Sequence, residues 1–161
     1  MIVPAQGDFR LDAEDDMARL GAALAGALEI GEAVCLSGPL GAGKSVLARG
    51  MIRALSPAER DVPSPTFTLV QFYEGARLKI AHFDLYRLTM ANEAFEIGLD
   101  ESLRDGAAVI EWAERLGHHL PANRLDIDIS LDGLEDDAQD VHARRARLAP
   151  HGAWEGRSID L

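Results

Sequence analysis

The sequence contains one cysteine, no apolar run long enough to cross a membrane, and no repeated or low-complexity segment. Cys35 cannot form an intramolecular disulfide. Because it lies in the apolar run 33–36, we expect a small buried side chain rather than a reactive thiol. The most apolar stretch, 20–28, is far shorter than the roughly 20 residues that a membrane-spanning helix needs. The first residues show neither a basic leader nor a continuous apolar signal segment, so we expect a cytoplasmic protein with no membrane contact.

Positive charge is also scarce. The chain has 16 Lys and Arg against 27 Asp and Glu, a formal net charge of -11. Because contacts to nucleic-acid phosphates need basic side chains, we expect no tight direct binding of nucleic acid. With 161 residues, 47% of them hydrophobic, and no shift in composition, the sequence predicts a single domain over 1–161, in which 150–161 form a loosely held C-terminal tail.

Hydrophobic periodicity predicts alternating helices and strands. Met17, Leu20 and Leu24 recur at spacings of three and four, which is typical of an amphipathic helix, here over 12–28. Apolar and polar residues alternate over 125–131, as in a strand with one buried face. The other expected elements are strands at 33–36, 67–73, 78–83 and 107–110, helices at 44–55 and 92–103, a helical turn at 112–119, a charged turn at 132–140 and a final edge strand at 141–149.

A glycine-rich segment lies between the predicted strand 33–36 and the predicted helix 44–55. Its sequence, G-P-L-G-A-G-K-S at 38–45, matches the pattern G-x-x-x-x-G-K-[ST], whose backbone amides bind nucleotide phosphates. The helix N-terminus adds positive potential for the same phosphates. An ordinary glycine-rich turn would explain the glycines, but not Lys44 and Ser45 at the start of the helix.

In this pattern the lysine contacts the terminal phosphates and the serine hydroxyl ligates Mg²⁺, so we expect ATP and Mg²⁺ as cofactors. The motif and its context predict an α/β fold of three layers, P-loop NTPase-like, with a mixed, mainly parallel central sheet flanked by helices. The predicted nucleotide-binding residues are Gly38, Leu40, Gly41, Ala42, Gly43, Lys44, Ser45 and Val46.

Two acidic residues each follow a predicted strand directly. Asp84 follows 78–83 and Glu111 follows 107–110, and α/β sheets bind ligands at these strand ends. Either carboxylate could hold Mg²⁺ beside Ser45, and either could instead be a solvated charge. Thr66, in a proline-rich loop, has a hydroxyl and an amide suited to a terminal phosphate, although threonine beside proline more often makes a turn. The predicted catalytic residues are Asp84, Glu111 and Thr66, and the predicted metal ligands are Ser45, Glu111 and Asp84.

Four further motifs accompany the P-loop in the same order as in one known family. They are S-P-T-F at 64–67, H-F-D-L-Y-R at 82–87, E-x-G-L-D-E at 96–101 and E-W at 111–112. The P-loop alone fits many ATPases, whereas S-P-T-F followed by H-x-D-x-Y-R is far more specific. With these motifs the chain resembles the bacterial TsaE (YjeE) ATPases of tRNA threonylcarbamoyladenosine synthesis.

This resemblance implies a small α/β protein that binds ATP, hydrolyses it slowly by itself and acts with the TsaB and TsaD proteins. It implies that Lys44 contacts phosphate and that Ser45 and Glu111 hold Mg²⁺. It also implies that Asp84 and Thr66 act at the terminal phosphate and its attacking water. The sequence shows no arginine recognisably placed to neutralise the transferring phosphoryl group, so we expect a magnesium-dependent ATPase that a partner stimulates.

Two other functions remain open from the sequence. A P-loop small-molecule kinase would use the same phosphate cradle, but no arginine-rich lid stands out between Glu111 and Pro121. A nucleotide-gated assembly module, with incidental turnover, would show the same motifs. Of the motif residues without an assigned role, we expect His82 to support the site from its strand and Trp112 to serve in packing.

Overall fold

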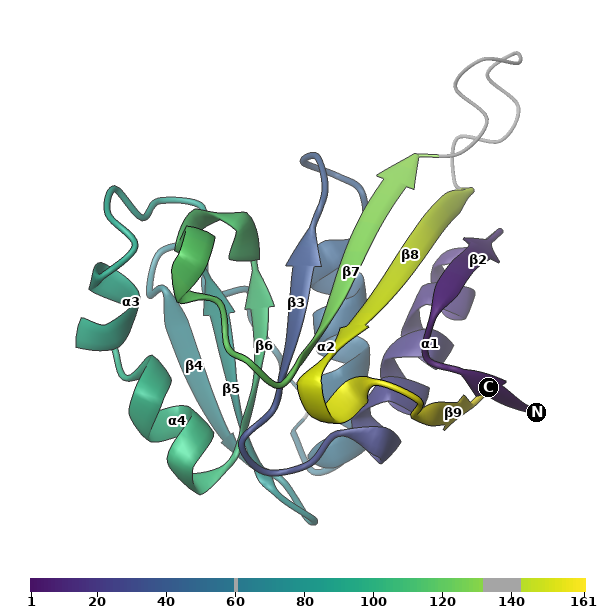
Figure 1. Ribbon diagram of the computed structural model, residues 1–161, viewed down its shortest axis with the longest axis horizontal. Helices are drawn as coiled ribbons and strands as arrows, with labels where there is room; N and C mark the ends of the chain where they lie inside the picture. The colour runs from purple at the N-terminus through teal and green to yellow at the C-terminus, as the bar shows by residue number, and fades with distance from the viewer. Residues whose placement is uncertain (60, 132–142) are drawn as a thin grey trace.

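The computed structural model describes residues 1–59, 61–131 and 143–161, which form a central sheet with helices on both faces (Figure 1). The helices are α1 (Glu14–Ala27), α2 (Lys44–Leu55), α3 (Glu93–Glu96) and α4 (Leu99–Asp105), with 3-10 helices η1 (Ala113–His119) and η2 (Gly152–Trp154). The strands are β1 (Ile2–Pro4), β2 (Gly7–Leu11), β3 (Ala33–Ser37), β4 (Val70–Glu74), β5 (Lys79–Asp84), β6 (Ala107–Glu111), β7 (Arg124–Leu131), β8 (Arg144–His151) and β9 (Ser158–Asp160).

The main sheet has the strand order β2-β8-β7-β3-β6-β5-β4. Its four central strands, β7, β3, β6 and β5, are parallel, while β4 pairs antiparallel with β5 at one edge. At the other edge β8 pairs antiparallel with both β7 and β2. The apolar runs of β3 and β6 are buried throughout, because strands in the middle of such a sheet are covered on both faces. The expected three-layer α/β fold with a mixed sheet is confirmed.

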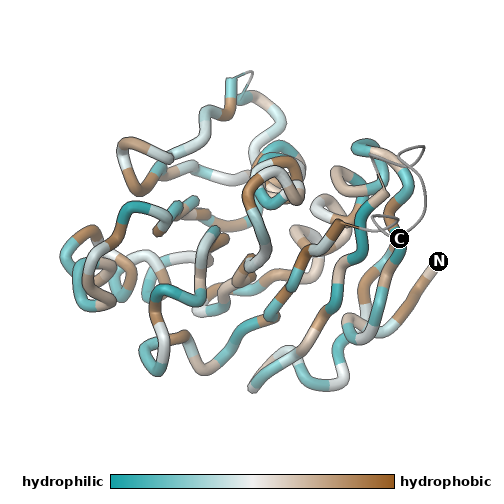
Figure 2. The backbone as a smooth tube through the Cα atoms, turned by 90° about the horizontal axis from the view of Figure 1, so that it is seen from above, coloured by the Kyte–Doolittle hydropathy of each residue, from teal (hydrophilic) through white to brown (hydrophobic). Residues whose placement is uncertain are grey.

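Two apolar clusters, one on each face, hold the layers together. On one face α1 and α2 pack against the sheet through side chains such as Leu20, Leu24 and Met51. On the other face α3, α4 and η1 cover Phe83 and its neighbours. Viewed from above, hydrophobic segments of the strands run between the layers (Figure 2). Helices α1 and α2 lie so close that a Cβ at Gly21 would meet the Leu47 carbonyl oxygen at 2.6 Å.

Most expected elements are present, and three differ. The expected helix 92–103 is two short helices, because Gly98 between them has φ 96° and ends the first. The expected strand 67–73 begins only at Val70, since 67–69 form a turn in which Leu69 has φ 70°. The expected edge strand 141–149 corresponds to β8, but β2, which the sequence analysis did not predict, covers its outer side. The charged turn expected at 132–140 lies outside the described residues.

The C-terminal segment differs from the loosely held tail expected over 150–161. Strand β9 pairs with β1, which brings the two ends of the chain side by side (Figures 1 and 2). Trp154 is fully buried, and the Arg157 guanidinium contacts both carboxylate oxygens of buried Glu32, at 2.5 and 2.8 Å. Burial of a large aromatic and of an ion pair fixes this segment against the end of α1. Within the described residues, no helix has the length and apolar character needed to cross a membrane.

Candidate active site

The P-loop runs from the end of β3 to the start of α2 in a conformation that needs glycine. Gly38, Gly41 and Gly43 have φ values of 140°, 78° and 109°, in the left-handed region that other residues rarely adopt. A Cβ at Gly38 would also lie 2.3 Å from the Ile129 carbonyl oxygen on β7. The Ala42 amide donates to the Pro39 carbonyl at 3.2 Å and closes the turn. The loop therefore leads directly into the N-terminus of α2, where free amides favour an anion.

Lys44 projects over this loop from the first turn of α2. Its ammonium donates to the carbonyls of Gly38, at 2.5 Å, and Pro39, at 2.8 Å, and it lies 4.2 Å from the ring centroid of Trp112. Burial lowers the pKa of Lys44, and nearby carboxylates, Glu111 first among them, oppose that shift. The side chain is thus a buried cation held by carbonyl dipoles and an aromatic face.

The sheet register brings the two predicted strand-end acids together. Asp84 on β5 pairs with Glu111 on β6, and Glu111 pairs in turn with Leu36 on β3, just before the P-loop. Residues at the same register of neighbouring parallel strands direct their side chains to the same face. Both carboxylates are buried, with exposed fractions of 4% and 2%. The C-terminal ends of β3, β5 and β6 therefore converge on one acidic site beside the P-loop.

Both oxygens of the Glu111 carboxylate are engaged. Oε1 accepts a hydrogen bond from the Ser45 hydroxyl at 2.8 Å, and Oε2 lies 2.5 Å from Nε2 of fully buried His82. His82 thus supports the site from β5, in the position expected from the sequence. The contact between Ser45 and Glu111 joins the P-loop to the neighbouring strand.

Asp84 links the proline-rich loop to the end of β5. Its Oδ2 accepts a hydrogen bond from the Thr66 hydroxyl at 3.2 Å, and its Oδ1 accepts one from the Tyr86 amide at 3.1 Å. The Thr66 hydroxyl also lies 2.9 Å from that of Ser64. Thr66 is therefore held at the site by a carboxylate that itself faces the P-loop.

These groups surround a pocket of about 320 Å³, which contains most of the predicted site residues and two others, Tyr86 and Trp112. It is lined by Leu40, Gly41, Gly43, Lys44, Ser45, Val46, Thr66, Asp84, Tyr86, Glu111 and Trp112. Gly38 contributes its carbonyl to Lys44 but does not line the pocket. Trp112, expected to serve in packing, lies against Lys44, and Tyr86 lies against Trp112 with ring centroids 5.0 Å apart. The positions of Tyr86 and Trp112 within the motifs H-F-D-L-Y-R and E-W were the sequence signal that could have placed them at the site.

A smaller pocket of about 160 Å³ adjoins the other side of the P-loop. Ala42, the remaining predicted residue, lines it together with Ala13, Glu14, Met17 and Arg144, among others. Arg144 comes from β8, more than 100 positions away along the chain, and the sequence analysis gave it no role. The P-loop is therefore bordered by hollows on two sides.

The oxygen ligands of the larger pocket suit magnesium. Ser45, Asp84 and Glu111 offer one hydroxyl and two carboxylates, the hard donors that Mg²⁺ prefers. Among the described residues no cluster of three or more His, Cys, Asp or Glu side chains could enclose a metal ion. This arrangement fits Mg²⁺, which is usually held by one or two carboxylates together with water and substrate phosphates.

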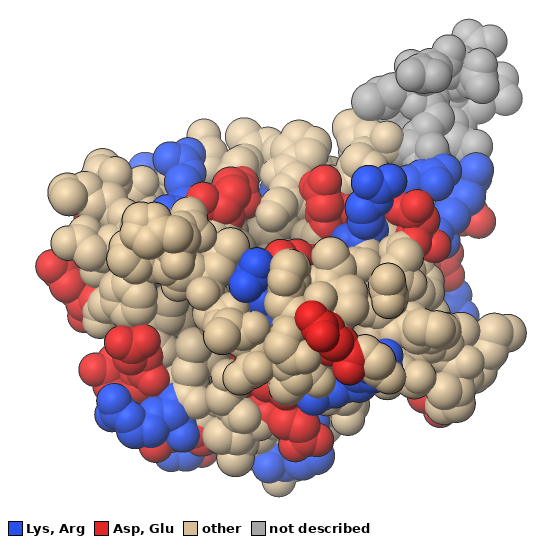
Figure 3. All heavy atoms as spheres, in the orientation of Figure 1, with Lys and Arg blue, Asp and Glu red and all other residues tan. Residues whose placement is uncertain are grey.

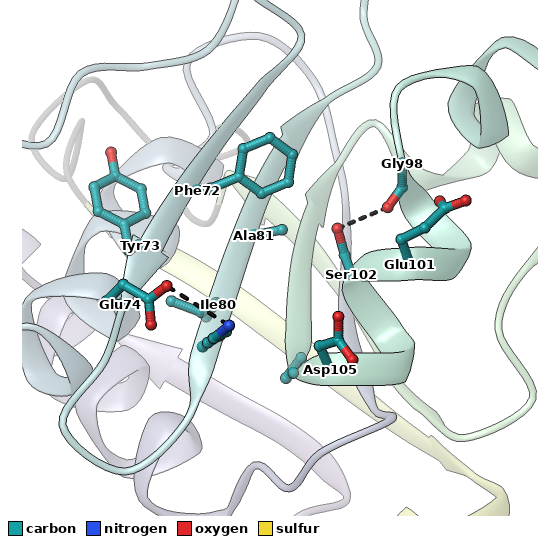
Figure 4. A pocket seen from close by; sticks show the side chains of 12 residues that line it. Phe72, Tyr73, Glu74, Ile80, Ala81, Gly98, Glu101, Ser102 and Asp105 are labelled. Carbon is teal, nitrogen blue, oxygen red and sulfur yellow. Dashed lines mark hydrogen bonds and ion pairs between the residues drawn. The ribbon is translucent and has the colours of Figure 1, made fainter.

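A third hollow, of about 340 Å³, lies away from the P-loop between the edge strand β4 and helix α4 (Figure 4). Phe72 borders it from the strand, and Glu101, Ser102 and Asp105 border it from the helix. The Ser102 hydroxyl donates to the Gly98 carbonyl at 2.7 Å. None of the predicted site residues lines this hollow.

A buried strand, a glycine-rich loop and a helix, with carboxylates at the neighbouring strand ends, define a P-loop NTPase-like protein. Comparison with known proteins gives the family. Residues 11–141 match the family model described as "Threonylcarbamoyl adenosine biosynthesis protein TsaE". The chain belongs to the TsaE family.

Individual relatives agree with this assignment. The TsaE protein of Treponema pallidum is 39% identical over 78% of this chain and 91% of its own length. The TsaE protein of Rickettsia bellii is 35% identical over 79% of this chain and 87% of its own. The crystal structure of Bacillus subtilis YdiB superposes with a TM-score of 0.71 at 26% identity, covering 94% of this chain and 88% of that one.

Proposed function

We propose that this chain binds Mg²⁺-ATP in the P-loop pocket and hydrolyses it slowly, as a component of tRNA threonylcarbamoyladenosine synthesis that acts with TsaB and TsaD. The observation that carries this proposal is the hydrogen bond between Ser45 and Glu111. It lies beside Lys44, at the point where Glu111 pairs with Asp84 on the neighbouring strand. It joins a P-loop hydroxyl to a strand-end carboxylate where the terminal phosphates would lie. Family membership and the names of the relatives support the pathway.

In this proposal each residue has a distinct task. The P-loop amides and Lys44 bind and orient the phosphates, and Ser45 and Glu111 hold Mg²⁺, with His82 fixing the carboxylate. Bound Mg²⁺ would neutralise charge on the phosphate oxygens. Thr66 and Asp84, joined by their 3.2 Å hydrogen bond, would position the attacking water. The four charged or ionisable side chains among these residues, Lys44, His82, Asp84 and Glu111, are buried, and electrostatic contacts are stronger in such an environment than in water.

The surroundings of the pocket support a partner. Among the described residues that line it, Lys44 is the one cation. Arg87 lies with its guanidinium over exposed Phe67, 4.7 Å from the ring centroid, and does not line the pocket. Leu40 and Phe67, next to the site, are 69% and 82% exposed. Exposed apolar side chains beside an incomplete set of positive charges favour a protein partner that supplies the missing cation in trans.

Protein rather than RNA is the expected contact. The net charge of -11 opposes binding of an RNA backbone. On the face shown in Figure 3, acidic and basic side chains are interspersed and form no continuous basic band.

One observation favours a second function, a nucleotide-gated assembly module. Thr66 contacts the site through Asp84, and the next residue, Phe67, is exposed. Loss of the terminal phosphate would therefore alter the surface around Phe67 to which a partner binds. Turnover would then be secondary to assembly.

Phosphate release from Mg²⁺-ATP tests the proposal, measured on the isolated chain and after addition of a TsaB–TsaD complex without RNA. We expect slow release alone and a marked rise in the mixture, since a cation supplied in trans can accelerate such reactions by about 10³ to 10⁵. Thr66→Ala should reduce the rise more than it weakens ATP binding. Equal rates with and without the complex would refute partner stimulation. Phosphate transfer to a small acceptor would indicate a kinase, and nucleotide-dependent assembly without a rate increase would indicate the gated module.

A further inference from the structure

Arg144, the first residue of β8, reaches the back of the P-loop. Its Nε donates to the Ala42 carbonyl at 3.0 Å, and its Nη2 donates to the Gly41 carbonyl at 3.2 Å. Its Nη1 donates at 3.1 Å to the carbonyl of Ala143, the residue just before the strand. The guanidinium thus bonds two consecutive peptide groups of the loop at once.

The direction of these bonds matters for phosphate binding. In a P-loop, successive backbone amides point toward the phosphates, so the carbonyls of the same segment point away from them. The Gly41 carbonyl shares its peptide with the Ala42 amide, which donates to the Pro39 carbonyl at 3.2 Å. The Ala42 carbonyl shares its peptide with the Gly43 amide. A cation on these two carbonyls therefore stabilises the closed turn and orients the Gly43 N–H away from the guanidinium. Bonds to a charged donor are shorter and roughly twice as strong as neutral ones. Arg144 therefore favours the loop conformation that presents amides to an anion.

The arginine is itself firmly placed. Arg144 pairs with Leu11 at the end of β2 on one side and with Leu131 at the end of β7 on the other, so its backbone is flanked by a strand on each side. Its side chain is half-buried. A planar guanidinium on a strand paired at both sides can fix a loop more tightly than a flexible surface cation.

We propose that Arg144 is a positioning residue, whose guanidinium fork holds the Gly41 and Ala42 peptides so that the P-loop amides are preset for nucleotide phosphates. This inference rests on the proposed nucleotide function and extends it to a strand outside the P-loop motif. Because Arg144 also borders the 160 Å³ pocket, a direct contact to the nucleoside part of a ligand is the competing role.

The two roles differ in which part of a ligand they affect. We would measure by calorimetry the affinities of the full chain for Mg²⁺-ATP, inorganic tripolyphosphate and adenosine. The variants are Arg144→Ala, Arg144→Lys and, as a matched control, Arg147→Ala. Arg147 lies on the same strand and pairs with exposed Asp8 at 3.1 Å, without a bond to the loop.

Arg144→Ala should weaken both ATP and tripolyphosphate by about tenfold, the effect of losing roughly one charged hydrogen bond, and should leave adenosine unaffected. Arg147→Ala should match wild type for all three ligands. Arg144→Lys should restore affinity only in part, because an ammonium keeps the charge but lacks the planar fork. The lysine variant also keeps the test available if the alanine variant does not fold.

Three results would overturn the inference. The first is that Arg144→Ala binds tripolyphosphate as tightly as wild type. The second is that Arg144→Lys binds ATP as tightly as wild type. The third is that Arg144→Ala loses affinity for ATP and adenosine alone, which would assign Arg144 to the nucleoside. If the wild-type chain binds neither ATP nor tripolyphosphate, the proposed function itself fails, and this outcome is distinct from a failure of Arg144 alone.

Discussion

Replacing Glu111 by glutamine separates its chemical role from its structural one. The amide has nearly the same shape, so its oxygen can still face His82 Nε2, 2.5 Å from the present carboxylate oxygen, and its NH₂ can donate to the Ser45 hydroxyl. The folding free energy should therefore change by less than about 1.5 kcal/mol, the value of one ordinary hydrogen bond. What disappears is the negative charge available to Mg²⁺.

Under the proposed function, the Glu111 charge acts mainly on the reaction. A residue that fixes the metal at the transferring phosphate damages the transition state more than the bound ground state when it is removed. We expect Glu111→Gln to bind ATP within about tenfold of wild type while kcat falls by about 10² or more, comparable to the loss of one preorganised electrostatic contact. Glu111→Ala should lose turnover as well. In addition it should lose about 1 to 3 kcal/mol of stability, because the buried His82 ring loses its hydrogen-bond partner.

The assay combines calorimetric ATP binding, phosphate release with TsaB–TsaD present, and urea unfolding. Glu114→Gln is the control, because it removes one unit of charge from an exposed position three residues away that also acts on Lys44. Wild-type turnover by Glu111→Gln, or an equal loss in Glu114→Gln, would show that Glu111 does not act at the metal.

Three further predictions follow from other contacts. Lys44→Ala should lose at least tenfold in ATP affinity, measured by calorimetry. Its thermal unfolding midpoint should stay within a few degrees of wild type, since the lysine faces the phosphate site. Unchanged binding would refute the P-loop assignment. Cys35 is 1% exposed, and burial raises its pKa, so the folded chain holds less thiolate than the unfolded chain at mildly alkaline pH. A thiol reagent at pH 8 should therefore react only on unfolding, and fast labelling of the native chain would contradict this. Glu32→Ala should lower the unfolding free energy in urea by about 1.5 to 3 kcal/mol, because Arg157 loses its carboxylate partner but keeps its bonds to the Ala27 and Ala153 carbonyls. Asp8→Ala, which removes an exposed pair, should cost at most about 1 kcal/mol.

Local signals account for what the sequence predicted well. The P-loop could be located because its glycines, lysine and serine occur within eight consecutive positions between a strand and a helix. Asp84 and Glu111 could be placed because each follows a buried apolar run, and parallel strands end at the same edge. The pairing of Asp84 with Glu111 across β5 and β6, and the contact of Glu111 with Ser45, could not be predicted from the sequence of either strand alone.

Long-range pairing accounts for what the sequence did not predict. Strand β2, near the start of the chain, pairs with β8, near its end. Its five residues show too little hydrophobic periodicity to be recognised as a strand from the sequence. Arg144 is one of several arginines near the C-terminus, and only the pairing of β8 with β7 places it behind the P-loop. The C-terminal segment looked loose because its one large apolar anchor, Trp154, is isolated in sequence.

Two contacts restrain the backbone of the P-loop, and they indicate which part of the site would move if phosphates bind as proposed. Gly38 lies so close to Ile129 that the backbone there has no room for a side chain, and Arg144 bonds the carbonyls of Gly41 and Ala42. The Lys44 side chain, by contrast, is held by two carbonyls and the Trp112 ring. Phosphate oxygens offer an ammonium stronger partners than neutral carbonyls do. If the chain binds nucleotide as proposed, we therefore expect the Lys44 ammonium to exchange the two carbonyls for phosphate oxygens by rotation of its side chain, while the loop backbone keeps its present conformation.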